Sequence, residues 1–313
     1  MVAKAKLSYR ITNWGEYNES LVRRGDVTFW FSDDAIENWE HANDEPKVGH
    51  PFVYSDTAVE CLLVLRELFR LPYRQTEGLG RSLASLMQVD VAIPDFTSLA
   101  KRAAGLGISL EVAVRKGPID VVVDSTGLKV FGEGEWKTRQ HGKSKRRTWR
   151  KLHLAVNPET QEIEAEVLTE NSGHDADQVD DLLEQIDGSI DAFYGDGIYD
   201  QWKVYETLAE RQIQPIIPPR KNAKIKQHGN ADCPPLARDE AIREIRRRGR
   251  KSWKELVGYH RRSLSETAMH RMKCCFGERL KNRELENQQI EATLRSKILN
   301  HFTHLGLPQF EWN

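Results

Sequence analysis

Residues 119–126 read IDVVVDST, a short run of β-branched apolar residues that ends at Asp124. A run of this kind is too short for a buried helix and predicts a strand that is buried on both faces. Directly before it, Gly117-Pro118 marks the point where the pattern changes from helical to strand-like. We therefore expect a second domain to begin near residue 113.

The residues after this strand continue with strand and helix patterns. Segments KLHLAV at 151–156 and EIEAEVLT at 162–169 alternate on either side of a turn, which predicts a β-hairpin. A hairpin followed by alternating strands and helices predicts an α/β domain with a mixed sheet over residues 113–313. The later strands are expected at 191–194 and 213–217, and the helices at 177–186, 202–211, 264–277 and 290–300.

Residues 1–112 carry a mostly helical pattern. One helix is expected after Ser55 or Asp56, the two candidate capping residues, and a shorter one, capped by Asp95, carries Lys101 and Arg102. Two helices with a short connection and basic residues are typical of a helix-turn-helix unit that reads DNA. They are equally typical of a small helical bundle with solvated lysines. We expect DNA binding by this domain, with Lys101 and Arg102 as contacts.

The composition limits the class of protein. The chain has 313 residues, with 46 lysines and arginines against 47 aspartates and glutamates, and this length suggests two domains. No apolar run approaches the roughly 18–20 residues of a membrane span, and the N-terminus has no signal-peptide core. The four cysteines form no C-x-x-C pair, which argues against structural zinc and a disulfide framework. We expect a cytoplasmic protein with reduced thiols.

The net charge of −1 conceals a strong segregation of charge along the chain. Residues 137–151 hold eight basic residues and no acid, whereas residues 152–202 hold fourteen acids and no lysine or arginine. A basic cluster that repels itself favours an anionic partner, so we expect contact with nucleic-acid phosphates. The alternative is a solvated loop that pairs with the acidic segment. The cluster consists of Lys137, Arg139, Lys143, Lys145, Arg146, Arg147, Arg150 and Lys151.

Two aspartates follow predicted buried strands. Asp124 ends the run IDVVVD, and Asp196 follows the strand in DAFYGDG, so both could project from one edge of a sheet. A carboxylate at a strand end is often only a cap. Two that lie together disfavour each other's charge unless a cation intervenes, and Mg²⁺ prefers oxygen ligands of this kind. Two such ions can support in-line displacement at a phosphodiester.

A third acid, Glu266, lies in a helical segment with Tyr259, Arg262 and Lys273. The spacings of three, four and seven residues are whole helical turns, so all four side chains could share one face. This face could be a surface ladder of ion pairs. It could equally be a metal ligand flanked by phosphate-binding groups, as phosphoryl transfer to DNA requires.

The pattern Tyr259-x2-Arg262-x3-Glu266-x6-Lys273 matches the signature around the third acid of bacterial insertion-sequence DDE transposases. IDVVVDSTGLKVFGEGEWK and YGDGIYD resemble the blocks around the first and second aspartates of the insertion-sequence-five family, as do WRKLHLAV and IIPPRK. The N-terminal stretches ITNWGEYNESLVRRG and VTFWFSDDAI are similar to the group typified by insertion sequence nine-oh-three. The resemblance covers nearly the whole chain.

This resemblance implies a ribonuclease-H-like catalytic domain over residues 113–313, preceded by a mostly helical DNA-binding domain over residues 1–112. Asp124, Asp196 and Glu266 would be the catalytic acids and the ligands of Mg²⁺, for which Mn²⁺ can substitute. The intervals of 72 and 70 residues between these acids leave no room for a large insertion domain before the glutamate. The residues that match the DNA-contacting positions of the family are Tyr259, Arg262 and Lys273.

The function implied is that of a transposase. It would bind the terminal inverted repeats of its element, cleave the phosphodiester at each end and join the 3′-hydroxyl to target DNA. Its partner would be double-stranded DNA, and because two ends are handled together, a homodimer or higher oligomer is expected on DNA. Such an enzyme would work in the bacterial cytoplasm at the nucleoid. The alternatives are a metal-dependent nuclease without strand transfer and a domesticated DNA-binding regulator.

Overall fold

The computed structural model describes residues 9–43, 49, 51–130, 149–227 and 235–312. The chain divides into two compact units. The first consists of Met1–Ile108 together with Lys297–Asn313, and the second of Ser109–Ser296. The sequence pattern placed a boundary near residue 112 and assigned the C-terminus to the second domain, whereas the contacts group the C-terminal segment with the N-terminal unit.

The first unit is mainly helical, as the sequence predicts. Ser55 accepts a hydrogen bond from the Ala58 amide and begins one helix, while Asp95 accepts from the Thr97 and Ser98 amides and begins another. The structure therefore selects Ser55 from the two candidates for the first cap and confirms Asp95 as the second. The helices are α1 (Trp14–Arg23), α2 (Asp33–Glu37), α3 (Asp56–Leu68), α4 (Tyr73–Met87) and α5 (Phe96–Ala103).

The two ends of the chain meet within the first unit. Strand β1 (Tyr9–Ile11) pairs antiparallel with β8 (Phe310–Trp312). Lys297, in the helix α12 (Leu285–Leu305), forms an ion pair with Glu60 on α3. Because these contacts join residues more than 200 positions apart, local sequence patterns contain no signal for them.

The second unit is built on a mixed six-stranded sheet within its described residues. Strand β2 lies at the centre, antiparallel to β3 on one side and parallel to β5 on the other. The order is β4-β3-β2-β5-β6, and β7 also pairs with β2. This arrangement confirms the predicted mixed sheet and is consistent with a ribonuclease-H-like domain. The strands are β2 (Ile119–Val130), β3 (Trp149–Val156), β4 (Ile163–Glu170), β5 (Ile190–Tyr194), β6 (Gln214–Ile216) and β7 (Arg279–Leu280).

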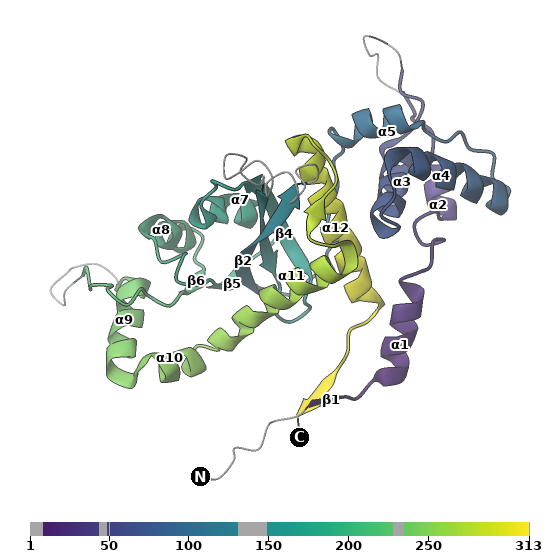
Figure 1. Cartoon of the computed structure of the whole chain (residues 1–313). Helices are drawn as coiled ribbons and strands as arrows, with labels where there is room; N and C mark the ends of the chain where they lie inside the picture. The colour runs from purple at the N-terminus through teal and green to yellow at the C-terminus, as the bar shows by residue number, and fades with distance from the viewer. Residues whose placement is uncertain (1–8, 44–48, 50, 131–148, 228–234, 313) are drawn as a thin grey trace, which may run out of the picture. The chain divides into compact units, whose positions relative to one another are not determined.

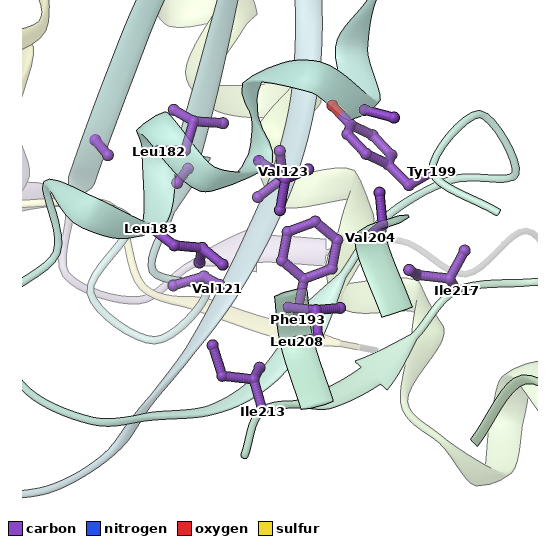
Figure 2. Packing of buried hydrophobic residues seen from close by; sticks show 14 of the residues in the cluster. Val121, Val123, Leu182, Leu183, Phe193, Tyr199, Val204, Leu208, Ile213 and Ile217 are labelled. Atoms are coloured by element: carbon purple, nitrogen blue, oxygen red, sulfur yellow. The ribbon is translucent and has the colours of Figure 1, made fainter. Parts of the chain in front are cut away.

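One face of this sheet carries the main apolar core of the unit (Figure 2). Val121, Val123 and Phe193 from β2 and β5 pack against α7 (Val179–Glu184) and α8 (Trp202–Glu210). All three side chains are fully buried, and burial of each contributes roughly 1.5–3 kcal/mol relative to exposure. The alternation of side chains between the two faces of β2 therefore fixes which of its residues face these helices.

The opposite face of β2 carries the residues at alternate positions, including Asp120, Val122 and Asp124. Val122 packs with Tyr194 and with the partly buried Tyr259. The helix α11 (Ser263–Phe276), preceded by the 3₁₀ turn η2 (Tyr259–Arg262), lies against β2 and β3 on this side (Figure 1). The alternation of the strand thus brings Asp124 to the helix that carries Glu266.

Two basic helices, α9 (Ala237–Arg248) and α10 (Arg250–Leu256), were not predicted. Their sequence has few apolar residues, so the hydrophobic period that marks a helix is weak there. The other helices and strands predicted in the second unit are present with shifted ends. Among the described ranges, no helix has the length and apolar character to cross a membrane.

Candidate active site

The parallel pairing of β2 and β5 aligns the two aspartates along the strand direction. Val122 on β2 is the register partner of Tyr194 on β5. Asp124 and Asp196 each lie two residues beyond this pair. Strand β5 ends at Tyr194, so Asp196 follows a strand end as predicted. Strand β2 continues to Val130, so Asp124 lies within its strand and not at the end.

Asp124 is a half-buried carboxylate with two strong donors. Its Oδ1 accepts a hydrogen bond from the Ser125 amide at 2.9 Å, and its Oδ2 accepts one from Arg262 Nη1 at 2.6 Å. Burial raises the pKa of the Asp124 carboxyl, and the negative charge of Asp196 adds to this effect against the two donors. A cation beside this carboxylate would therefore be favourable.

Asp196 is held by the tight turn YGDGIYD. Its Oδ1 accepts a hydrogen bond from the Ile198 amide at 2.8 Å, and its carbonyl accepts one from the Tyr199 amide. The preceding Gly195 has no room for a side chain, because a Cβ atom there would lie 2.9 Å from Cδ2 of Tyr199. The turn therefore brings the Tyr199 ring against the backbone that carries the second aspartate.

Arg262 links the first and third acids. Its Nη1 donates to Asp124, and its Nη2 donates to Oε1 of Glu266 one turn later. The side chains of Arg262 and Asp124 are 21% and 20% exposed, whereas that of Glu266 is 58% exposed. The guanidinium therefore bridges a half-buried carboxylate and an exposed one.

The signature residues do not lie on one continuous α-helix as the spacing suggested. Tyr259 and Arg262 belong to η2, and α11 begins at Ser263. Gly258 precedes the turn with a positive φ of 64°, which bends the chain between α10 and η2. Lys273 lies further along α11 and is half-buried. The turn still directs Arg262 towards Glu266, so the two come together.

The hydroxyl of Tyr259 on η2 experiences the charges of all three predicted acids. Burial raises the pKa of the Tyr259 hydroxyl, and three negative charges raise it further against the effect of Arg262. These charges belong to Asp196, Asp124 and Glu266. Lys254 on α10 lies over the Tyr259 ring at 4.5 Å from its centre. The structure therefore joins Asp124 and Glu266 through Arg262, and it places Tyr259 within reach of the charges of all three predicted acids.

A buried polar cluster beside the site was missed by sequence reasoning. Asp175 pairs with Lys151, Nζ to Oδ1 at 2.9 Å, and lies 3.4 Å from Nδ1 of the fully buried His153. Burial lowers the pKa of His153 to about 4, so this imidazole is neutral at physiological pH. The Tyr199 hydroxyl is buried near Asp175, and within the described chain it has no hydrogen-bond partner. No spacing in the sequence connects these residues.

Four of the predicted DNA contacts can be located outside the signature. Arg150 donates to Gln288, and Lys151 is paired with Asp175, so contact with DNA would require these bonds to exchange. Arg102 pairs with Asp56, whereas Lys101 is exposed on α5. The remaining predicted contacts lie outside the described residues. They are Lys137, Arg139, Lys145, Arg146 and Arg147.

The donor set fits a hard divalent cation. Asp124, Asp196 and Glu266 offer only carboxylate oxygens, which suit Mg²⁺ and Mn²⁺. In the described parts of the chain, no three histidine, cysteine, aspartate or glutamate side chains already stand as a metal-ligand cluster. The guanidinium of Arg262 forms ion pairs with two of the three acids, Asp124 and Glu266.

Comparison with known families agrees with this geometry. Two family models, each described as a transposase DDE domain, match residues 22–133 and 115–300. The second match covers more than half of the chain and spans all three predicted acids. The resemblance to insertion-sequence DDE transposases is confirmed, whereas membership of the insertion-sequence-five family stays a prediction. The chain therefore belongs to the DDE transposases, which are metal-dependent enzymes that cleave and join DNA.

Proposed function

We propose that this transposase binds the terminal inverted repeats of its own element, hydrolyses the phosphodiester at each end and joins the 3′-hydroxyl to target DNA. The observation that carries the proposal is the register of the parallel strands β2 and β5, which aligns Asp124 with Asp196. In addition, Arg262 donates hydrogen bonds to both Asp124 and Glu266. Together the three carboxylates would serve a phosphodiester that approaches from solvent.

Asp124, Asp196 and Glu266 would hold Mg²⁺, with Mn²⁺ as a substitute. When bound, such ions supply activation of the attacking oxygen and stabilisation of the leaving oxygen in an in-line displacement. The burial of Asp124 supports this role, because its raised pKa reflects a negative charge that lacks full compensation. The intact triad disfavours a regulator that no longer cuts.

The chain's own basic residues would position the DNA. Lys273 on α11 and Arg262 on η2 lie on the signature segment beside Glu266, where a guanidinium and an ammonium can bind phosphate oxygens. The basic residues of 137–151 would neutralise further phosphates. Recognition of the terminal repeats is assigned to the helical region before residue 112. A homodimer or higher oligomer would hold two ends together, in the bacterial nucleoid.

A strand-transfer assay with end-containing DNA and Mg²⁺ tests the proposal. The wild-type chain should both cut the ends and join them to target DNA. D124N, D196N and E266Q should each lose both products at least about a thousandfold while retaining end binding, since the chemistry of a metal site depends on every ligand. E255Q, at an exposed glutamate on α10, is the matched control and should retain both products.

Each alternative gives a different result in this assay. A nuclease without strand transfer would cut but not join, and a domesticated regulator would bind and do neither. A triple variant of the acids that still nicked the ends in Mg²⁺ would contradict the triad assignment.

A further inference from the structure

Two consecutive arginines on η2 face two acids on one side of β2. Arg261 pairs with Asp120, and Arg262 pairs with Asp124. Of these two arginines, Arg262 alone makes a second ion pair with a described residue, and its partner is Glu266 on α11. The two pairs are alike in residue type and in the elements that they join. They differ in that Arg262 bridges two acids of the triad, whereas Asp120 is not one of them.

The bridge of Arg262 satisfies the same electrostatic need that a metal ion would satisfy. Asp124 is half-buried, and the register of β2 against β5 brings Asp196 to its level, so a nearby positive charge stabilises the ionised form of Asp124. The guanidinium fork can donate to two carboxylates at once, one from each terminal nitrogen. While it does so, Asp124 Oδ2 and Glu266 Oε1 are both occupied by N–H donors. A divalent ion that needs both acids must compete with this arginine.

We propose that Arg262 is a built-in counter-cation of the first and third acids, which holds them in the metal-free chain and must release at least one of them before a divalent ion binds to both. This inference rests on the proposed role of the triad as the metal site. It adds a second role to a residue for which only DNA contact was expected. The geometry also provides a route for release, because Glu266 is largely exposed and the outer half of the bridge opens to solvent.

The proposal predicts that the bridge weakens metal binding in the absence of DNA. A lysine at position 262 keeps the positive charge but has one ammonium group in place of the two-pronged fork, so it bridges two carboxylates poorly. R262K should therefore bind metal more tightly than the wild type even though the net charge is unchanged. R262Q, which removes the charge as well, should bind more tightly still.

The experiment is a titration of the full-length chain with Mn²⁺, followed by electron paramagnetic resonance of the free ion, without DNA. We expect R262Q to lower the dissociation constant for Mn²⁺ about tenfold, which corresponds to about one charge-assisted hydrogen bond. R262K should lie between R262Q and the wild type. R261Q and R261K are the matched controls, because they alter the neighbouring Arg–Asp pair outside the triad. Their dissociation constants should stay within about twofold of the wild type.

Several results would overturn the proposal. The first is Mn²⁺ binding by both Arg262 variants that is no tighter than that of the wild type. The second is a dissociation constant of R262K equal to that of the wild type. The third is a decrease in the dissociation constant of R261Q as large as that of R262Q. The last two results would assign any effect to general charge and not to the bridge. If D124N leaves Mn²⁺ binding unchanged, the metal role in the proposed function fails, and this outcome is recognisable without any Arg262 variant.

Thermal melting of each variant, with and without Mn²⁺, covers the case in which Arg262 is needed for folding. If the metal-free Arg262 variants are unfolded or strongly destabilised, saturating Mn²⁺ should restore their melting temperature, since one cation replaces another. If Mn²⁺ did not restore the melting temperature, Arg262 would have a structural role that a metal ion cannot replace, and the proposal would be rejected.

Discussion

Val122 and Tyr194 are register partners on the parallel strands β2 and β5, and each stands two residues before an aspartate of the triad. The pairing of two apolar residues thereby aligns two acids that lie 72 positions apart in the chain. Any change that shifts this register by one residue would turn one aspartate to the opposite face of the sheet. Core packing and the geometry of the site are therefore coupled.

Gly195 should tolerate no side chain. In G195A the new Cβ would lie 2.9 Å from Tyr199 Cδ2 and 3.0 Å from Phe193 Cε1, both in fully buried rings. We expect a loss of about 1–3 kcal/mol in the free energy of unfolding, together with reduced end cleavage because Asp196 moves. Urea denaturation and the cleavage assay measure the two effects. The control is G197A, whose Cβ would meet no atom closer than 3.6 Å. It should reduce the free energy of unfolding and the end cleavage less than G195A does.

Glu166 should make the fold less stable as the pH rises. Burial raises its pKa to about 7 from the usual 4.5, against a hydrogen bond donated by Thr293 Oγ1 at 2.6 Å. Between these two values the folded state keeps a proton that the unfolded state loses. The contribution of this proton to the free energy of unfolding is therefore complete below pH 4.5. It declines as the pH rises and is lost above pH 7.

The substitution E166Q should remove this dependence. The free energy of unfolding of E166Q, relative to the wild type, should increase by about 2–3 kcal/mol between pH 4.5 and pH 8. Denaturant titrations of both proteins across this range measure the difference. E170Q, at an exposed position of the same strand, should show no comparable trend. A difference between E166Q and the wild type that stayed constant with pH would contradict the assignment.

The hydroxyl of Tyr199 should lower the free energy of unfolding. It is buried, and among the residues that the structure describes it has no hydrogen-bond partner. Y199F should therefore raise the free energy of unfolding by about 1 kcal/mol, because a desolvated polar group is removed. Y205F should do the opposite, since the Tyr205 hydroxyl donates to Asp200 at 3.2 Å. Urea denaturation at neutral pH compares the two, and a loss of stability in Y199F would mean that its hydroxyl has a partner.

The basic segment 137–151 should act on phosphates without reading bases. Each phosphate contact contributes about 0.9 to the slope of log affinity against log salt on duplex DNA. Replacing Lys145, Arg146 and Arg147 with glutamine should therefore flatten this slope by up to roughly 2–3 units on any duplex. The preference for terminal repeats over random DNA should change little. An unchanged slope with a lowered melting temperature would instead favour pairing with the acidic segment of the same chain.

Much of the second unit could be predicted because its signals are local. The valine run before Asp124, the alternation of the hairpin and the short strand before Asp196 each depend on neighbouring residues, so their strands follow from the sequence. The spacing from Tyr259 to Lys273 likewise identified the family. The helices α9 and α10 were not predicted because they have few apolar residues, so the apolar period is weak there.

The sequence by itself determined the family, the three candidate acids, the strand that carries Asp124 and the strand that precedes Asp196. Only the tertiary structure decided the register of β2 against β5, the pairing of β1 with β8 and the cluster of Lys151, His153 and Asp175. It also decided that Arg262 bridges Asp124 and Glu266. The physical reason is that these contacts, apart from the local pair of Arg262 and Glu266, join residues far apart in the chain. Packing of the whole unit, and not the propensity of neighbouring residues, selects which of these groups meet.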